Sequence, residues 1–414
     1  MLVKDNSATK LAMTLEDQYG AHNYHPLPVV LSRGKGVHVW DVDGKKYYDF
    51  LSAYSAVNQG HCHPRIIKRL KEQAERLTLT SRAFYNDQLG RYEKYLSGYF
   101  GFERVLPMNT GAEAVETAIK LCRKFAYEKR NIAENKAVIL VCENNFHGRT
   151  TTIISFSSDE KAKKNFGPYT PGFEMIPYDD LEALEKAIAA DENIAGFLVE
   201  PIQGEAGVYV PREGYLKAAR AICKRNGVLF IADEVQTGVA RTGKLLAVEH
   251  EEVRPDILVL GKALSGGVYP VSAVLADSEI MEVIQPGEHG STFGGNPLAA
   301  AVAMEALEVV KEERLAENAD RLGKIFREEM RRFAETSKLV VEVRGKGLLN
   351  AIVINDTEES ETAWNICLKL RDNGLLAKPT HGNIIRFAPP LVMTEEQLRD
   401  CIRIIVDTIT SMED

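Results

Sequence analysis

The central part of the chain alternates between amphipathic helical segments and short runs of consecutive apolar residues. Helices are predicted at Arg65–Leu77, Ala112–Lys129, Leu181–Ala190 and Gly214–Asn226. Strands are predicted at Arg104–Met108, Val138–Cys142, Thr152–Phe156, Ala195–Glu200, Val228–Asp233, Ile257–Gly261 and Ser272–Ala276. An apolar run without polar alternation is typical of a strand covered on both faces, so the runs predict an α/β fold with a mostly parallel sheet.

The order of elements changes toward the C-terminus. A helix is predicted from Asn296-Pro297 to about Lys311, because asparagine is a favoured N-cap and proline a favoured first helical residue. Further helices are predicted at Leu315–Thr336, Glu361–Asn373 and Glu395–Thr410, and further strands at Leu339–Arg344, Gly347–Ile354 and Ile384–Phe387. Thr394 and Gln397 have the spacing of a capping box before the last helix. This order predicts a smaller α+β domain.

The N-terminal part of the chain predicts a β-hairpin. Two strand-like segments, Val37–Val42 and Lys46–Phe50, flank the dipeptide Asp43-Gly44, which favours a type I′ turn. A single hairpin is marginally stable in water, so we expect it to pack against a larger body. These patterns divide the chain into an N-terminal arm and hairpin (1–63), a large domain (64–314) and a small C-terminal domain (315–414).

Composition argues against several classes of protein. The 414 residues carry a formal net charge of -8, which argues against nucleic acid as a partner, and no basic tract indicates a membrane surface. No apolar segment is long enough to span a bilayer. Six cysteines are dispersed singly, which fits a reducing compartment. Residues 1–10 lack a signal-peptide pattern, so a cytoplasmic location is expected, or the mitochondrial matrix if a transit peptide has been removed.

Lys262 is the first candidate for chemistry. It follows the apolar run Ile257–Gly261, and functional residues in parallel sheets gather at the carboxyl ends of the strands. Burial lowers the pKa of a lysine, and a neutral amine forms a Schiff base with a carbonyl compound such as pyridoxal phosphate. The alternative is a lysine whose stem lies along the core while its ammonium reaches water.

Three further segments supply parts that a pyridoxal phosphate site needs. The turn Asn109–Ala114 leads into a helix whose N-terminal N–H groups suit a phosphate, although a simple capped turn has the same sequence. Asp233 ends a buried strand and suits a protonated pyridine nitrogen, with a structural salt bridge as the alternative. Phe146 suits stacking on a ring, and Arg149 suits a bidentate grip on a carboxylate. We interpret His147 as a hydrogen-bonding partner rather than a base.

Other kinds of site fit the sequence less well. No Gly-x-Gly-x-x-Gly pattern follows an early strand, and Gly261-Lys262 lacks the remaining residues of a P-loop. His61-Cys62-His63 has the residue types of a metal site, but no further ligands cluster nearby in the sequence. A structural loop is therefore predicted there, and no metal.

Over essentially its full length the chain resembles the class III (ω-) aminotransferases, which are fold-type I pyridoxal phosphate enzymes. The motifs that carry the resemblance are Tyr19–Tyr24, Ser52–His61, Asn109–Ala114, Phe146–Thr150, Glu200–Glu205, the segments around Asp233 and Lys262, and Gly290–Pro297. The resemblance implies a large mostly parallel sheet domain, a smaller α+β domain and bound pyridoxal 5′-phosphate. It also implies a homodimer with active sites at the interface.

The resemblance assigns expected roles to individual residues. Lys262 is expected to bind the cofactor covalently and to move the proton between substrate and cofactor, with Asp233 on the pyridine nitrogen. Gly111 and Ala112 are expected to bind the phosphate, Phe146 and Val235 to lie on the two faces of the ring, and Gln236 to contact the phenolic oxygen. Thr292, with Ser291 beside it, is expected to reach the phosphate bound by the neighbouring subunit.

The combination of Tyr24, Tyr54, Arg149, Glu205 and Arg386 resembles family members that act on ornithine. It implies ping-pong transfer of the δ-amino group of L-ornithine to 2-oxoglutarate, which gives glutamate 5-semialdehyde and glutamate. Tyr24 and Arg149 are expected to hold the α-amino and α-carboxylate groups of ornithine. One alternative is an aminotransferase of the same family with another donor, such as N-acetylornithine or 4-aminobutyrate. Another is a protein without this activity: a non-catalytic binding protein on this fold, or an unrelated nucleotide binder.

Glu205 and Arg386 have a physical reason to act together. An enzyme of this kind admits ornithine by its distal amine but glutamate by its α-carbon. A free Arg386 would bind the α-carboxylate of ornithine and misdirect it. We therefore expect Glu205 to neutralise Arg386 in the first half-reaction and to release it in the second, with a fixed structural pair as the alternative.

Overall fold

A computed structural model describes residues 7–413 of the chain. Its large sheet has seven strands in the order β4 (Arg104–Met108), β10 (Ser272–Ala276), β9 (Ile257–Leu260), β8 (Leu229–Asp233), β7 (Ile194–Val199), β5 (Val138–Cys142) and β6 (Phe173–Ile176). Strand β10 runs antiparallel to both of its neighbours, and the other pairs are parallel. The mostly parallel sheet predicted from the apolar runs is confirmed.

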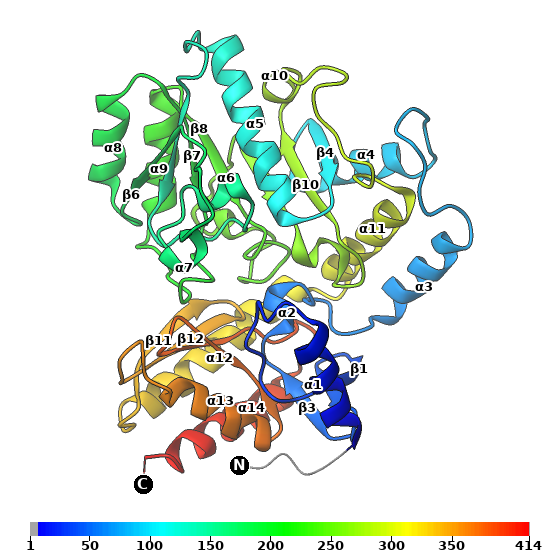
Figure 1. Ribbon diagram of the computed structural model, residues 1–414, viewed down its shortest axis with the longest axis vertical. Helices are drawn as coiled ribbons and strands as arrows, with labels where there is room; N and C mark the ends of the chain where they lie inside the picture. The colour runs from blue at the N-terminus through cyan, green and yellow to red at the C-terminus, as the bar shows by residue number, and fades with distance from the viewer. Residues whose placement is uncertain (1–6, 414) are drawn as a thin grey trace.

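Helices cover both faces of this sheet (Figure 1). The helices α5 (Gly111–Lys129), α6 (Thr151–Ile154) and α10 (Ser278–Met281) contribute to one hydrophobic cluster. The helices α8 (Leu181–Ala190), α9 (Tyr215–Arg225) and α11 (Pro297–Glu312) contribute to the other, and α3 (Pro64–Ala74) and α4 (Leu89–Phe100) pack on α11. Every residue of β7, β8, β9 and β10 is buried, which explains why these strands lack polar alternation.

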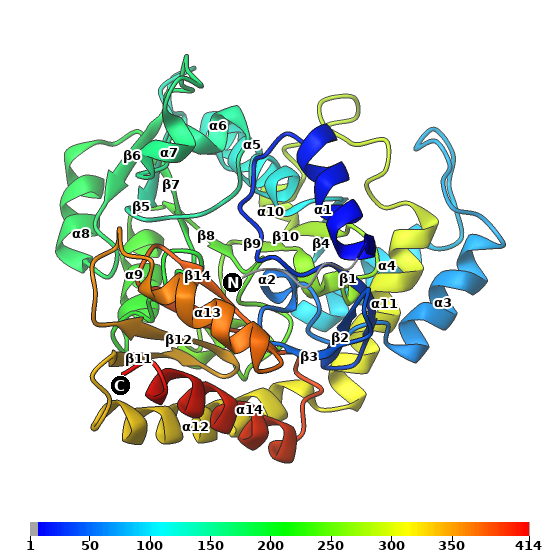
Figure 2. The ribbon, with the colours of Figure 1, turned by 60° about the horizontal axis from the view of Figure 1, so that its bottom comes forward.

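The smaller body combines the two ends of the chain (Figure 2). Its first sheet joins β1 (Leu31–Lys35), β2 (His38–Asp41) and β3 (Lys46–Asp49) to β13 (Leu375–Leu376), so the N-terminal hairpin packs against a C-terminal segment. Its second sheet has the order β11 (Val340–Lys346), β12 (Leu349–Ile354), β15 (Ile384–Phe387) and β14 (Lys378–Thr380). The helices beside these sheets are α12 (Leu315–Ala334), α13 (Thr362–Asp372) and α14 (Glu395–Thr410).

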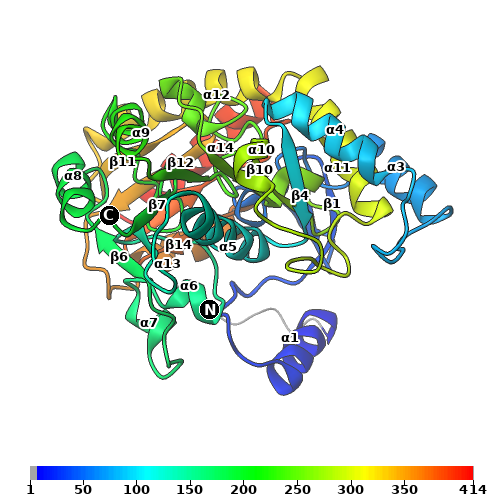
Figure 3. The same ribbon diagram turned by 90° about the horizontal axis from the view of Figure 1, so that it is seen from above.

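Helix α1 (Ser7–Tyr19) projects from the rest of the molecule in Figure 3. Its apolar side chains Leu11, Leu15 and Tyr19 are exposed. No helix within residues 7–413 is long and apolar enough to cross a membrane. All six cysteines are free, and Cys62 is the exposed one.

The strand predicted at Thr152–Phe156 is wrong, because this segment forms helix α6. Its β-branched residues favour a strand by propensity. The side chain of Thr150, however, accepts the N–H of Ile153 at 3.2 Å as an N-cap, and the helical turn buries Ile153 and Ile154. The edge strand of the sheet is instead β6, which the sequence analysis did not predict.

The type I′ turn predicted at Asp43-Gly44 is also wrong. That turn needs positive φ at both central residues, but only Gly44 has it, with φ of 83°. The N–H of Gly44 donates to the carbonyl oxygen of Asp41 at 3.1 Å, so the turn begins one residue earlier than predicted. The predicted helix caps are confirmed: Asn296 accepts from the N–H of Ala299 at 2.8 Å, and Thr394 forms a capping box with Gln397.

The loop His61-Cys62-His63 has hydrogen-bond partners that explain its polar residues. His61 Nε2 lies 2.7 Å from Asp49 Oδ2, and His63 Nε2 lies 2.9 Å from Glu313 Oε1. Both contacts tie the loop to its surroundings, as a structural loop requires.

Candidate active site

A cavity of about 180 Å³ lies at the carboxyl ends of the parallel strands. Its lining is Gly111, Ala112, Phe146, His147, Gly148, Glu200, Ile202, Asp233, Val235, Gln236, Thr237 and Lys262. Segments far apart in the sequence meet here because parallel strands end at the same edge of a sheet. The structure thus brings together all of the predicted cofactor contacts except Ser291 and Thr292.

Lys262 follows β9 and begins the short 3-10 helix η2 (Lys262–Ser265) with a positive φ of 45°. Lys262 is half-buried at the cavity, and this burial lowers its pKa, although the charge of Asp233 acts in the opposite direction. A lysine with a lowered pKa has a larger neutral fraction at neutral pH, and only the neutral amine is a nucleophile.

Asp233 is 5% exposed at the end of β8 and is held from two sides. His147 Nδ1 lies 2.7 Å from its Oδ2, and the N–H of Val235 donates to its Oδ1 at 3.0 Å. Burial disfavours charge on His147, but the hydrogen bond and the charge of Asp233 outweigh burial and raise the pKa of His147. The hydrogen-bonding role that we interpreted for His147 is confirmed. Its Nε2 is buried without a hydrogen-bond partner among residues 7–413.

The N-terminus of helix α5 also lines the cavity, through Gly111 and Ala112. Thr110 caps this helix in a capping box with Glu113. Within the described part of the chain, the N–H groups of Gly111 and Ala112 donate no hydrogen bond, as expected in the first turn of a helix. A Cβ on Gly111 would lie 2.8 Å from Cγ1 of Val235, so glycine is needed for this close approach. Free N–H groups at a helix N-terminus suit an anion.

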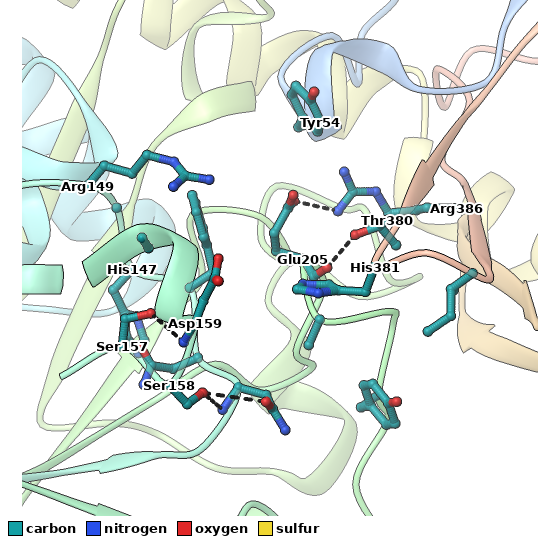
Figure 4. A pocket seen from close by; sticks show the side chains of 18 of the residues that line it. Tyr54, His147, Arg149, Ser157, Ser158, Asp159, Glu205, Thr380, His381 and Arg386 are labelled. Atoms are coloured by element: carbon teal, nitrogen blue, oxygen red, sulfur yellow. Dashed lines mark hydrogen bonds and ion pairs between the residues drawn. The ribbon is translucent and has the colours of Figure 1, made fainter. Parts of the chain in front are cut away.

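A second cavity of about 620 Å³ adjoins the first and shares Phe146, His147 and Gly148 with it. All five predicted substrate contacts line this larger cavity: Tyr24, Tyr54, Arg149, Glu205 and Arg386. Figure 4 shows Arg149 on one side and the pair of Glu205 and Arg386 on the other.

Arg386 lies on β15 and is 2% exposed. Its Nη1 donates to Glu205 Oε2 at 2.9 Å and to the carbonyl oxygen of Gly204 at 3.2 Å, while its buried Nε has no hydrogen-bond partner among residues 7–413. Burial favours the neutral form of Glu205, but Arg386 outweighs this effect and lowers the pKa of Glu205. The pair is therefore ionic at neutral pH, and the guanidinium keeps an unused donor.

Tyr54 reaches the cavity from an unusual backbone segment. Ser52, Ala53, Tyr54 and Ser55 have φ of 48°, 48°, 60° and 72°, which is the left-handed region. Each such non-glycine residue costs roughly 1–2 kcal/mol. Asp49 Oδ1 offsets part of this cost by accepting the N–H groups of Leu51 and Ser52, both at 2.9 Å. The turn places the Tyr54 ring 5.1 Å from Cζ of Arg386.

Arg149 and Tyr24 lie where the larger cavity opens to solvent. Tyr24 is 67% exposed, and Arg149 is exposed with its Cζ 5.4 Å from the centre of the Phe146 ring. Arg149 forms no ion pair with any residue between 7 and 413. A guanidinium without a counterion beside a cavity suits a carboxylate ligand.

Ser291 and Thr292 line neither cavity. Ser291 Oγ accepts a hydrogen bond from Asn109 Nδ2 at 2.8 Å, and Thr292 is exposed. Their contact with the phosphate of a neighbouring subunit stays a prediction.

The sequence analysis did not single out Glu200, Thr380 or His381, which also line the two cavities. Two signals were available for Glu200: it ends the predicted strand Ala195–Glu200, and it begins the motif Glu200–Glu205. The hydroxyl of Thr380 donates to the carbonyl oxygen of Glu205 at 2.5 Å, a contact between distant segments that no local pattern indicates.

Comparison with known proteins gives a consistent result. The model of the family "Aminotransferase class-III" matches residues 19–409. The mitochondrial ornithine aminotransferase of Drosophila ananassae is 61% identical over 406 residues, which cover 98% of this chain and 93% of that protein.

Two solved structures are similar over nearly the whole chain. The ornithine aminotransferase from Toxoplasma gondii, crystallised with partial occupancy of PLP at its active site, has a TM-score of 0.96 and 52% identity over 98% of this chain and 95% of that one. The acetylornithine aminotransferase from Elizabethkingia anophelis has a TM-score of 0.90 and 63% identity over 97% of this chain and 99% of that one. With a family match over most of its length and relatives of this similarity, the chain belongs to the class III aminotransferases.

Proposed function

We propose that this class III aminotransferase uses pyridoxal 5′-phosphate to transfer the δ-amino group of L-ornithine to 2-oxoglutarate. One observation carries the choice of substrate. Beside the cavity that contains Lys262, the buried Arg386 is ion-paired with Glu205 while Arg149 has no counterion within residues 7–413. Of the two arginines that line this cavity, Arg149 is therefore available to the single carboxylate of ornithine, and Arg386 is held in reserve for a dicarboxylate.

The residues of the smaller cavity fit the cofactor. Lys262 would supply the amine for covalent attachment, Asp233 would accept a hydrogen bond from the protonated pyridine nitrogen, and the N–H groups of Gly111 and Ala112 would bind the phosphate. Val235 and Phe146 would contact the ring, and Gln236 would donate to its phenolic oxygen. When bound, the cofactor supplies the electron sink that stabilises the substrate carbon after it loses its proton.

Lys262 then acts as the base. With the cofactor bound, the amine of Lys262 would take the proton from the substrate carbon and later return it. Its lowered pKa increases the fraction of the amine that is neutral and can take this proton. His147 keeps Asp233 oriented, because its hydrogen bond fixes the carboxylate against the ring nitrogen.

Arg149 and Tyr24 set which end of ornithine reacts. Arg149 binds the α-carboxylate and Tyr24 the α-amino group, which leaves the δ-amine at Lys262. With Glu205 on Arg386, the inner cation does not compete for the carboxylate. In the second half-reaction, 2-oxoglutarate brings two carboxylates, and Glu205 releases Arg386 to bind the one next to the reacting carbon.

The active unit is a homodimer in this proposal. Phe84, Tyr85 and Phe293 are large apolar side chains with exposed fractions of 70%, 104% and 49%, and Phe293 adjoins Thr292. A second copy that covers these residues would bury apolar surface and bring Thr292 to the phosphate of its neighbour. For the location, the word "mitochondrial" in the name of the Drosophila relative supports the matrix over the cytosol.

N-Acetylornithine is the second candidate donor, because a structure with 63% identity is named an acetylornithine aminotransferase. Steady-state kinetics with L-ornithine, N-acetylornithine and 4-aminobutyrate separate the candidates. Both alternatives lack the α-ammonium that Tyr24 holds, so kcat/KM should fall about 10- to 100-fold relative to ornithine. Higher kcat/KM for N-acetylornithine would replace the proposed donor.

The Glu205→Ala variant tests the proposed switch. Without Glu205, Arg386 is free in both half-reactions and captures the α-carboxylate of ornithine, which brings the α-amine to the cofactor. The ratio of δ- to α-amine transfer should fall about tenfold or more, while single-turnover reaction with glutamate is retained. Glu358→Ala, which removes another carboxylate of the same cavity, is the matched control and should keep the ratio. An unchanged ratio in Glu205→Ala would show a fixed structural pair.

A further inference from the structure

Glu200 is a buried acid in the cofactor cavity to which the proposed reaction gives no role. It directly follows β7, is 6% exposed and lines the smaller cavity together with Lys262 and Asp233. Its backbone is held in place, because the hydroxyl of Tyr178 donates to the carbonyl oxygen of Glu200 at 3.1 Å and to that of Pro201 at 3.0 Å. These bonds fix the main chain from which the carboxyl group extends.

The carboxyl group makes one direct contact that bears on the cofactor. Glu200 Oε2 accepts the backbone N–H of Phe146 at 2.9 Å. Phe146 lies in the irregular segment between β5 and α6, where no sheet or helix holds its backbone. This hydrogen bond joins that segment to β7, so the position of the Phe146 ring at the cavity depends on Glu200.

Glu200 also has no cationic partner in direct contact within residues 7–413. The charged groups that face it come from three other segments: His147 after β5, Asp233 at the end of β8 and Lys262 after β9. Lys262 in turn faces Glu205 and Arg386 of the larger cavity. Burial raises the pKa of Glu200 to about 7, with His147 and Lys262 acting against burial and Asp233 adding to it. A carboxyl group of this kind changes charge near neutral pH.

We infer that Glu200 is a positioning residue for the cofactor: its hydrogen bond to Phe146 holds the stacking ring in place, and its negative charge favours the protonated form of the nitrogen that joins Lys262 to the cofactor. The inference rests on the proposed cofactor, but it does not depend on which amine is the donor. Two substitutions separate its parts. Glu200→Gln keeps an oxygen that accepts the Phe146 N–H and removes the charge, whereas Glu200→Ala removes both.

The test measures cofactor binding and visible absorption without any amino donor, so it is independent of ornithine turnover. In Glu200→Ala, the dissociation constant of pyridoxal phosphate should rise about tenfold and the induced circular dichroism of the bound cofactor should weaken. In Glu200→Gln, the dissociation constant should stay within about threefold of the unmodified protein. The pH midpoint of its visible absorption should fall by about one unit, because the lost negative charge no longer stabilises the protonated nitrogen.

Glu234→Gln is the matched control. Glu234 is also buried, its pKa is also raised to about 7 by burial, and it accepts a backbone N–H, that of Val248 at 2.8 Å, but it does not line the cofactor cavity. Its substitution should leave the absorption midpoint unchanged. The inference is overturned if Glu200→Ala binds the cofactor as tightly as the unmodified protein, or if Glu200→Gln keeps the original midpoint. A midpoint that moves equally in Glu234→Gln also overturns it, because any buried acid would then have this effect.

Discussion

Replacing Lys262 with alanine is expected to lower the rate of amino transfer by about 10⁴-fold, because the variant loses the group that removes and returns the proton. The cofactor should still bind, because its other contacts are unchanged. These are the N–H groups of Gly111 and Ala112, the carboxylate of Asp233, and the side chains of Phe146 and Val235. It should, however, become dissociable. Borohydride should fix pyridoxal phosphate covalently on the unmodified protein and fail to do so on Lys262→Ala, as mass spectrometry of the intact chain would report.

Two controls make this result specific. Lys262→Arg keeps a positive charge at the cavity but offers no neutral amine, so it should be as inactive as the alanine variant. A small primary amine added to Lys262→Ala should restore part of the activity, because it replaces the missing base. Borohydride fixation at another lysine, or a variant that retains more than about a tenth of the activity, would remove Lys262 from the proposed chemistry.

Replacing Asp233 with asparagine is expected to lower the rate by about 10²- to 10³-fold. Asparagine has nearly the same shape, but it carries no charge to hold a proton on the pyridine nitrogen, so the ring withdraws fewer electrons from the substrate carbon. The same change should lower the pKa of His147, because burial then acts on this imidazole without the charge that opposes it. His147 should thus lose its proton at lower pH than in the unmodified protein, which NMR titration of the imidazole would detect.

A cofactor analogue provides the check on Asp233. A pyridine ring with a fixed positive charge at nitrogen, as in the N-methyl derivative of pyridoxal phosphate, does not need the carboxylate to hold a proton. With this analogue, the difference in rate between Asp233→Asn and the unmodified protein should shrink. If the difference stays the same, Asp233 acts through the shape of the cavity and not through the ring nitrogen.

Periodicity and caps predicted most of the fold. Six strands of the large sheet and helix α8 agree with the predicted segments to within a residue at each end, because each forms from a local pattern that has no competing cap. The strand prediction for Thr152–Phe156 was wrong because two local signals conflict there. The β-branched residues favour a strand, whereas the cap at Thr150 favours a helix, and tertiary burial favours the helix. Strand β6 was not predicted because it is a short edge strand whose two middle residues are exposed, so it has no continuous apolar run.

The site was predictable where a residue ends a strand or belongs to a motif, as Lys262 and Asp233 do. The left-handed turn at Ser52–Ser55 was not, because none of its four residues is a glycine, and the side chain of Asp49, which accepts the N–H of Ser52, lies in a segment predicted as a strand. Glu200 was noted as a strand end and as the first residue of the motif Glu200–Glu205, but without a role. Its contact with the backbone of Phe146 spans 54 positions in the sequence, and no local pattern contains such a pairing.

The central claim is that the δ-nitrogen of L-ornithine is the one transferred. L-ornithine labelled with ¹⁵N at the δ position alone, incubated with 2-oxoglutarate and the purified protein, tests it directly through the mass of the glutamate formed. The arrangement of Arg149, Tyr24 and the Glu205–Arg386 pair predicts glutamate that carries the label in equal amount to the ornithine consumed. Unlabelled glutamate would mean that the α-amine is transferred, and would contradict this arrangement of the substrate.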